Sequence, residues 1–282
     1  MLAGLAACGG EMCTGSAANT LQRGLPSDPE TLDHHKARST QAAEVLRDLG
    51  EGLAGFTANG ELIPAAAESW DISADGLTYT FHLRDGLRWS NGDTLTAEHF
   101  AAGMRRLVNP ATAAFYAQMI ADIDNAVAIV AGEAAPEALG VEAVDDRTLV
   151  LRLARPTPYM LSLLTHPSTF PVHPGAIAEH GDGFARPGKL VSNGAYRLEA
   201  WVPGSIVALK RNEHYWNNDA TAVDAVNYHV IVQNSAELNR YRAGELHTTS
   251  TVPPDAFAQV KDEYSDELRI APYLAVYYYG YN

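Results

Sequence analysis

Residues 77–84 alternate strictly between apolar and polar side chains, and this alternation constrains the fold more than any other feature of the sequence. A period of two directs successive side chains to opposite faces of an extended chain, so the pattern predicts a β-strand with one buried face. Turn-forming pairs, Asp85-Gly86 and Asn91-Gly92, follow the strand. Its apolar face consists of Leu77, Tyr79, Phe81 and Leu83.

Helical patterns occur between the predicted strands. Apolar residues recur at i, i+3, i+4 and i+7 from Ala42 to Leu49, which predicts an amphipathic helix. Asn109-Pro110 ends a second helix, because the residue before a proline avoids the helical conformation. The predicted helices cover residues 41–49, 97–108 after a Thr96 cap, the segment from a Ser235 cap to Arg242 with Gly244 beyond its end, and 256–261.

Further extended segments complete the prediction of a mixed α/β fold. Residues 141–144 and 149–153 flank the turn residues Asp145-Asp146, which predicts a β-hairpin. The other predicted strands cover residues 20–25, 196–201 and 206–210 around a Pro203-Gly204 turn, 226–232, and 268–279.

The charge balance narrows the class of protein. Acidic residues number 34 against 20 basic residues, which gives a formal net charge of −14 at pH 7. A protein that binds nucleic acid needs a basic face, so this balance argues against that class. The length of 282 residues, 46% of them hydrophobic, is enough for about two domains with buried cores. No apolar run reaches the roughly 18 residues that a membrane span requires.

Motifs for cofactors and catalysis are absent or incomplete. Residues 50–55 match G-x-G-x-x-G but follow a helix, whereas a dinucleotide site needs a preceding strand. Residues 183–190 resemble a phosphate-binding loop without its final Ser or Thr. His166, His173 and His180 are interpreted as surface or packing residues and not as a metal site. We therefore predict no cofactor and no enzymatic activity, with a hydrolase as the least favoured alternative.

The N-terminal residues resemble a bacterial lipoprotein signal. Leu5-Ala6-Ala7-Cys8 has an apolar segment and small residues before a cysteine, the pattern that predicts cleavage and lipid attachment at Cys8. The apolar segment is short and has no basic residue before it, so we expect residues 1–19 to be a truncated signal and tether. The chain is then expected in the periplasm, anchored to a membrane through Cys8.

Tyrosines cluster near the C-terminal end of the sequence. Alternation places Tyr277 and Tyr279 on one face of a strand and Tyr278 on the other. A tyrosine has an apolar ring with a polar tip, which suits the lining of a cleft that takes varied side chains. The same pattern also fits an ordinary core strand, and both interpretations remain open here.

A series of ordered motifs resembles the periplasmic oligopeptide-binding proteins of ABC importers, the family 5 extracytoplasmic solute-binding proteins. The resemblance extends from about Thr20 to Asn282 and includes a His-Pro-Ser sequence at residues 166–168. The motifs are SDPETLD at 27–33, EGL at 51–53, AESW at 67–70, YTFHLR at 79–84, LRWSNG at 87–92, TAEHF at 96–100, VSNGAY at 191–196, YWNN at 215–218, NRYRAGE at 239–245 and PYL at 272–274.

This resemblance implies a fold and a domain organisation. The fold would be that of the periplasmic binding proteins of type II, cluster C, in which two lobes close around an extended peptide. Residues 20–50 and 174–282 would form an incomplete domain I, and residues 51–173 an inserted domain II. Family members continue into a second lobe, so we expect the 282 residues to be an N-terminal portion that binds peptides weakly when alone.

The resemblance also implies which residues meet the peptide. The ligand backbone pairs with strand-like protein segments in such proteins, and Arg38, Ser39 and Thr40 match a segment that offers backbone groups. Ser250 falls where the family often has asparagine, and His34 replaces a usual proline. Side chains near the cleft would be those of Tyr116, His166, Tyr273 and Tyr278.

The function implied is the capture of oligopeptides by the substrate-binding component of an ABC importer. Its partners would be an oligopeptide and the permease subunits of the inner membrane, with no nucleic acid, and the protein would act as a monomer. Relatives that bind murein peptides, dipeptides or another small solute remain the alternative.

Overall fold

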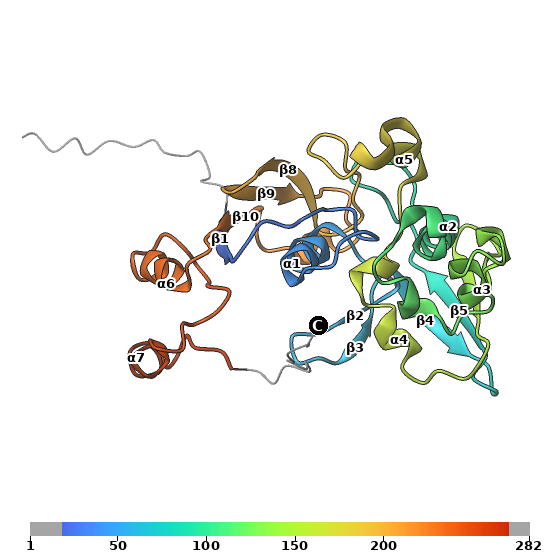
Figure 1. Ribbon diagram of the computed structural model, residues 1–282, viewed down its shortest axis with the longest axis horizontal. Coiled ribbons are helices and arrows are strands. Elements are labelled where there is room, and N and C mark those ends of the chain that lie inside the picture. Colours follow the sequence, from blue (N-terminus) through green and yellow to red (C-terminus); the bar gives the residue numbers. More distant parts are fainter. Residues whose placement is uncertain (1–18, 271–282) are drawn as a thin grey trace, which may run out of the picture.

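The computed structural model describes residues 19–270, whose elements are drawn in Figure 1. Strands and helices are mixed along these residues, as the sequence predicts. Cys8, Tyr273 and Tyr278 lie outside the described residues, and so does most of the predicted strand 268–279, whose first three residues are irregular. None of the described helices is long and apolar enough to cross a bilayer.

The first sheet has four strands in the order β1-β10-β9-β8 (Figure 1). β1 runs parallel to β10, with Thr20 opposite Ala225 and Leu25 opposite Val230, and the other pairs are antiparallel. A parallel pair requires a long connection, and here the chain passes through the whole second sheet between β1 and β10. The strands cover Thr20–Leu25 (β1), Ala225–Val230 (β10), Ile206–Arg211 (β9) and Tyr196–Val202 (β8).

Helix α1, Thr40–Leu49, packs against this sheet and confirms the predicted helix. Its N-terminus is capped by the Ser39 hydroxyl, which accepts the N–H of Ala42 at 3.1 Å. Gly50 ends the helix, so the G-x-G-x-x-G sequence follows a helix and runs into strand β2. The first core includes Leu25, Leu32, Ala42, Val45, Leu46, Leu49, Phe184, Leu198, Val207, Leu209, Val226 and Tyr228.

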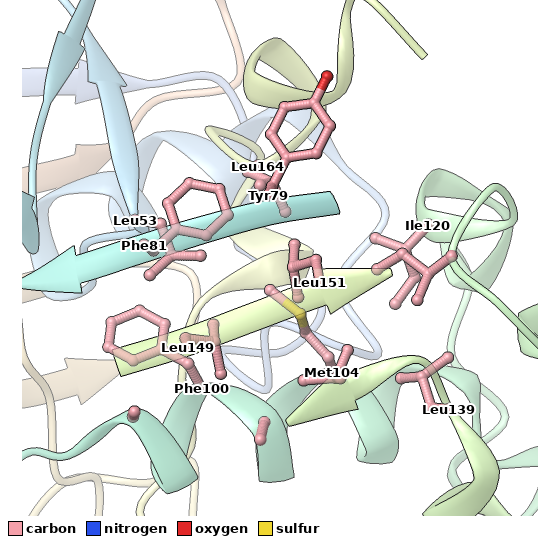
Figure 2. Packing of buried hydrophobic residues seen from close by; sticks show 14 of the residues in the cluster. Leu53, Tyr79, Phe81, Phe100, Met104, Ile120, Leu139, Leu149, Leu151 and Leu164 are labelled. Carbon is pink, nitrogen blue, oxygen red and sulfur yellow. The ribbon is translucent and has the colours of Figure 1, made fainter. Parts of the chain in front are cut away.

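The second sheet is antiparallel throughout, with the order β4-β5-β7-β6. β5 carries the predicted alternation, since Tyr79, Phe81 and Leu83 are buried and the residues between them are not. Figure 2 shows Phe100 and Met104 of helix α2 directed toward the leucines of β7. The elements cover Ala67–Ile72 (β4), Thr78–Leu83 (β5), Val141–Ala143 (β6), Thr148–Arg152 (β7) and Ala97–Val108 (α2).

A second, larger core lies between this sheet and α2. The elements around this core confirm the predicted hairpin, now β6–β7, and the predicted helix that begins after Thr96. Strand β5 and helix α2 each turn one apolar face inward, which is why their periods could be recognised in the sequence. The second core includes Leu53, Tyr79, Phe81, Leu83, Trp89, Phe100, Met104, Leu107, Ile120, Ile123, Ile129, Leu149, Leu151 and Leu164.

Several short elements were not predicted. Strands β2, Ala54–Phe56, and β3, Leu62–Pro64, form a small hairpin of three residues each, too short to display a period. The other short elements are Ala126–Val130 (α3), Met160–Leu163 (α4), Pro174–His180 (α5), and the 3-10 helices Pro110–Thr112 (η1), Ala117–Ile120 (η2), Pro136–Ala138 (η3), Pro167–Thr169 (η4), Gly181–Gly183 (η5) and Asn218–Ala220 (η6).

Helices α6, Asn234–Arg242, and α7, Phe257–Glu263, lie to one side of the first sheet (Figure 1). The prediction that Ser235 caps α6 is wrong, because the helix begins two residues earlier than such a cap requires and Gln233 occupies the cap position. The carbonyl of Gln233 already accepts the N–H of Glu237 at 3.0 Å, which sets the first turn. Gly244 has φ +73° just beyond the helix, as predicted for a terminating glycine.

A partly buried carboxylate joins the loop after α1 to the loop after β9. Glu51 accepts the hydroxyl of Tyr215 at 2.5 Å and the indole N–H of Trp216 at 2.6 Å. Burial raises the pKa of Glu51 despite these two donors. Trp216 packs on the second core, so this contact fixes that core relative to α1.

Candidate ligand-binding site

A hollow of about 690 Å³ lies at the N-terminal end of α1 and gathers five of the implied site residues. Arg38 and Ser39 come from the loop before α1, and Thr40 is its first residue. Tyr116 and His166 come from the chain of the second sheet, where they directly precede η2 and η4. The lining is completed by His34, Ala37, Ala43, Glu44, Leu46, Arg47 and Pro167.

The backbone at the entrance to α1 is held by Glu30. Its carboxylate accepts the N–H of Arg38 at 2.5 Å, the N–H of Ser39 at 2.9 Å, and the Ser39 hydroxyl. Burial alone would raise the pKa of Glu30, but these hydrogen bonds hold it below its ordinary value. The carboxylate therefore stays charged and fixes the path of the chain at the hollow.

Tyr116 connects the two sides of the hollow. Its hydroxyl donates to the carbonyl oxygen of Arg38 at 3.2 Å. Its ring meets the ring of His166 edge to face, with centroids 4.8 Å apart and an interplanar angle of 66°. These two rings thus form an aromatic wall opposite the N-terminus of α1.

His166 is held in a neutral state. Its Nδ1 accepts the N–H of Ser168 at 3.2 Å and lies 2.8 Å from the Ser168 hydroxyl. Burial lowers the pKa of His166 to about 4, and the charge of Arg47 acts in the same direction. The imidazole therefore contributes a polar but uncharged surface near pH 7.

The sequence prediction missed Glu30, Glu44 and Arg47. Residues 40, 43, 44 and 47 follow the spacing i, i+3, i+4, i+7, so they share the polar face of the same helix that buries Ala42 and Leu46. That spacing could have placed Glu44 and Arg47 beside Thr40. No local pattern identifies Glu30, because it contacts Arg38 and Ser39 across a loop.

Ser250 is not brought to this hollow. It borders a separate groove of about 560 Å³ between α6 and α7. Its hydroxyl donates to one carboxylate oxygen of Glu237 at 2.9 Å, and its N–H donates to the other at 2.7 Å. The carboxylate of Glu237 thus occupies both donors of Ser250.

Within residues 19–270, no cluster of three or more His, Cys, Asp and Glu side chains could hold a metal ion. His173 instead caps α5, where its Nδ1 accepts the N–H of Ala176 at 3.0 Å. An open hollow lined by polar groups and aromatic rings, in a mixed α/β fold, is typical of a ligand-binding protein. The chain belongs to the bacterial extracellular solute-binding proteins, family 5, whose middle-region model matches residues 61–282.

Relatives of this family were found in both sequence and structure. The periplasmic oligopeptide-binding protein OppA of Escherichia coli strain K12 is 40% identical over 269 residues, which cover 93% of this chain and 49% of OppA. A probable deoxycholate-binding periplasmic protein, YgiS, of the same strain is 42% identical over 258 residues, 91% of this chain and 48% of YgiS. The names of both relatives describe binding proteins and not enzymes.

A solved structure also matches this chain over a similar length. Haemophilus influenzae OppA in complex with the peptide RPPGFSPFR superposes with a TM-score of 0.85 at 38% identity, over 88% of this chain and 49% of that one. The chain therefore spans about half the length of the relatives that it matches.

Proposed function

We propose that this chain forms part of the substrate-binding component of an ABC importer, which captures oligopeptides in the periplasm and delivers them to permease subunits. The observation that carries this proposal is the hollow, in which Arg38, Ser39 and Thr40 face Tyr116 and His166. The names of OppA relatives, which are periplasmic and oligopeptide-binding, support the same assignment. We propose a monomer, with lipid attachment at Cys8 as its link to the membrane.

The proposed fold is that of a type II periplasmic binding protein of cluster C. The two separate cores support the division into domain I, residues 20–50 and 174–282, and inserted domain II, residues 51–173. All members of the first core fall in the first of these sets and all members of the second core in the other. The hollow is lined from both sets of residues, as expected of a site between domains.

A bound peptide would lie along residues 38–40 with its side chains near the aromatic wall. The N–H groups of Arg38 and Ser39 are bound to Glu30, so the contacts would come chiefly from side chains. Tyr273 and Tyr278 remain further proposed contacts, whereas Ser250 borders the separate groove and would not meet a peptide in the hollow. A different small solute is the second candidate, because a relative of 42% identity is named as probably deoxycholate-binding.

Photo-cross-linking tests the proposed site without requiring tight binding. The chain would be irradiated with millimolar Ala-benzoylphenylalanine-Ala, and the adducts mapped by mass spectrometry. We expect adducts within residues 34–47 and at Tyr116 or His166, reduced by excess unlabelled trialanine. Adducts that form elsewhere, or that deoxycholate displaces and trialanine does not, would contradict peptide binding at the hollow.

A further inference from the structure

Two arginines in the hollow differ from all others in residues 19–270. Every other arginine in this part of the chain forms an ion pair, donates a side-chain hydrogen bond or stacks on a ring. Arg38 and Arg47 do none of these, although both line the same hollow. Both residues are exposed, so each guanidinium is accessible to a ligand.

The acidic side chains near the hollow do not form ion pairs with Arg38 or Arg47. Glu30 is already bound to the backbone N–H groups of residues 38 and 39. Glu44 is the one carboxylate that lines the hollow, and burial raises its pKa although Arg23 and Arg47 oppose this. With His166 neutral, two guanidinium groups and one carboxylate line the hollow, and the charged Glu30 is held by the backbone of residues 38 and 39 outside this lining.

We infer that the hollow prefers peptides with an acidic side chain, whose carboxylate is bound by Arg38 and Arg47; this rests on the proposed peptide-binding function. A guanidinium can donate two parallel hydrogen bonds to the two oxygens of a carboxylate. The uncharged His166 and the Tyr116 ring leave room beside the arginines for the apolar part of such a side chain. A basic side chain would instead meet both guanidinium groups and be repelled.

Competition against the photo-reactive peptide tests this preference. The competitors are Ala-Glu-Ala, Ala-Gln-Ala and Ala-Lys-Ala, all amidated at the C-terminus so that only the side chain differs in charge. Exposed charge pairs change affinity by about 1.5- to 5-fold each, so two pairs predict that the Glu peptide competes about 2- to 25-fold better than the Gln peptide. We expect the Lys peptide to compete least. Unamidated Ala-Gln-Ala shows whether a terminal carboxylate can replace the acidic side chain.

Variants locate the source of the preference. Arg38→Gln and Arg47→Gln should each lower the Glu-to-Gln ratio, and the double variant should bring it to about 1. Lys210→Gln removes one exposed positive charge from β9, away from the hollow, and should leave the ratio unchanged. For the unaltered chain, 0.5 M NaCl should also reduce the ratio, since salt screens exposed charges.

Each outcome separates this inference from the proposed function. Equal competition by the Glu and Gln peptides, or a preference that persists in the double variant, overturns the inference and leaves peptide binding intact. If the unamidated Gln peptide competes better than the amidated Gln peptide while the amidated Glu peptide does not, the arginines bind a terminal carboxylate. This result would overturn the side-chain preference. Failure of every peptide to compete overturns both.

Discussion

Arg106 of α2 donates to both carboxylate oxygens of Asp33, at 2.8 and 2.7 Å. The two side chains are only 16% and 4% exposed, and Asp33 directly precedes His34, which lines the hollow. Burial alone would raise the pKa of Asp33, but the hydrogen bonds and charge of Arg106 hold it below its ordinary value. This ion pair joins the helix of the second core to the loop between β1 and α1.

Removing the charge of Asp33 should therefore weaken the fold. Breaking a buried ion pair leaves the other charge unpaired, so we expect Asp33→Asn to lower the free energy of unfolding by roughly 3 kcal/mol in urea titrations. Glu199→Gln is the control, because Glu199 pairs with Arg197 at 2.8 Å on the surface and should change stability by less than about 1 kcal/mol. Equal effects of the two substitutions would rule out a special role for the buried pair.

Acid should destabilise the chain through two partly buried histidines. Burial lowers the pKa of both His34 and His166 from 6.5 to about 4. A histidine with a lowered pKa in the folded state stabilises the fold fully above pH 6.5, and this stabilisation is lost as the pH falls from 6.5 toward 4. Burial raises the pKa of Asp48 and Glu51, so these two groups act in the opposite direction.

His166→Asn separates these contributions. Asparagine can accept the N–H of Ser168 as His166 does, but it does not titrate. The unaltered chain should lose unfolding free energy between pH 7 and pH 5. We expect this loss to be about 1 to 2 kcal/mol smaller in the variant. An identical loss in both chains would show that His166 does not contribute to the acid sensitivity.

Gly24 of β1 lies against the buried carboxylate of Glu237. A Cβ atom added at Gly24 would stand 1.6 Å from Oε1 of Glu237, a side chain that is 0% exposed and bound to Ser250. Gly24→Ala must displace this carboxylate, so we expect a loss of about 2 kcal/mol or more in thermal or urea unfolding. Gly55→Ala on β2 is the control, because its new Cβ would meet only Ala65 and Ile63 at 3.7 and 3.9 Å. A tolerated Gly24→Ala would contradict the observed packing.

Glu30→Gln tests the clamp on the entrance to α1. The amide side chain keeps its shape but loses the charge that strengthens the bonds to Arg38 and Ser39. We expect hydrogen exchange at these two amides to become about 10-fold faster, while exchange at Gly50, bonded to Leu46 at the other end of α1, stays unchanged. No acceleration at residues 38 and 39 would mean that the path of the loop does not depend on Glu30.

Most of the regular fold could be predicted because its elements bury one face. The alternation around Phe81 and the helical spacing of Val45 and Leu49 both reflect contact with a core. The start of α6 could not be predicted from Ser235, because a serine can also stand within the first turn. The capping roles of His166 and His173 were missed because histidine is an uncommon capping residue and is more often considered for metals.

The residues of the candidate site could be predicted only from the resemblance to the family 5 solute-binding proteins. Arg38, Tyr116 and His166 are far apart in the sequence, and no period connects them. Their meeting depends on how the two cores pack, which the Asp33–Arg106 pair and similar long-range contacts determine. Tertiary packing therefore supplies the part of the site that local patterns could not.

The central claim is that a peptide binds in the hollow at the N-terminus of α1, and a nuclear magnetic resonance titration with trialanine tests it most directly. We predict the largest chemical shift changes at Arg38, Ser39, Thr40, Tyr116 and His166. We also predict a Kd weaker than micromolar, because the 282 residues match only about half the length of their relatives. Largest changes around the groove between α6 and α7, or no changes at millimolar trialanine, would contradict the claim.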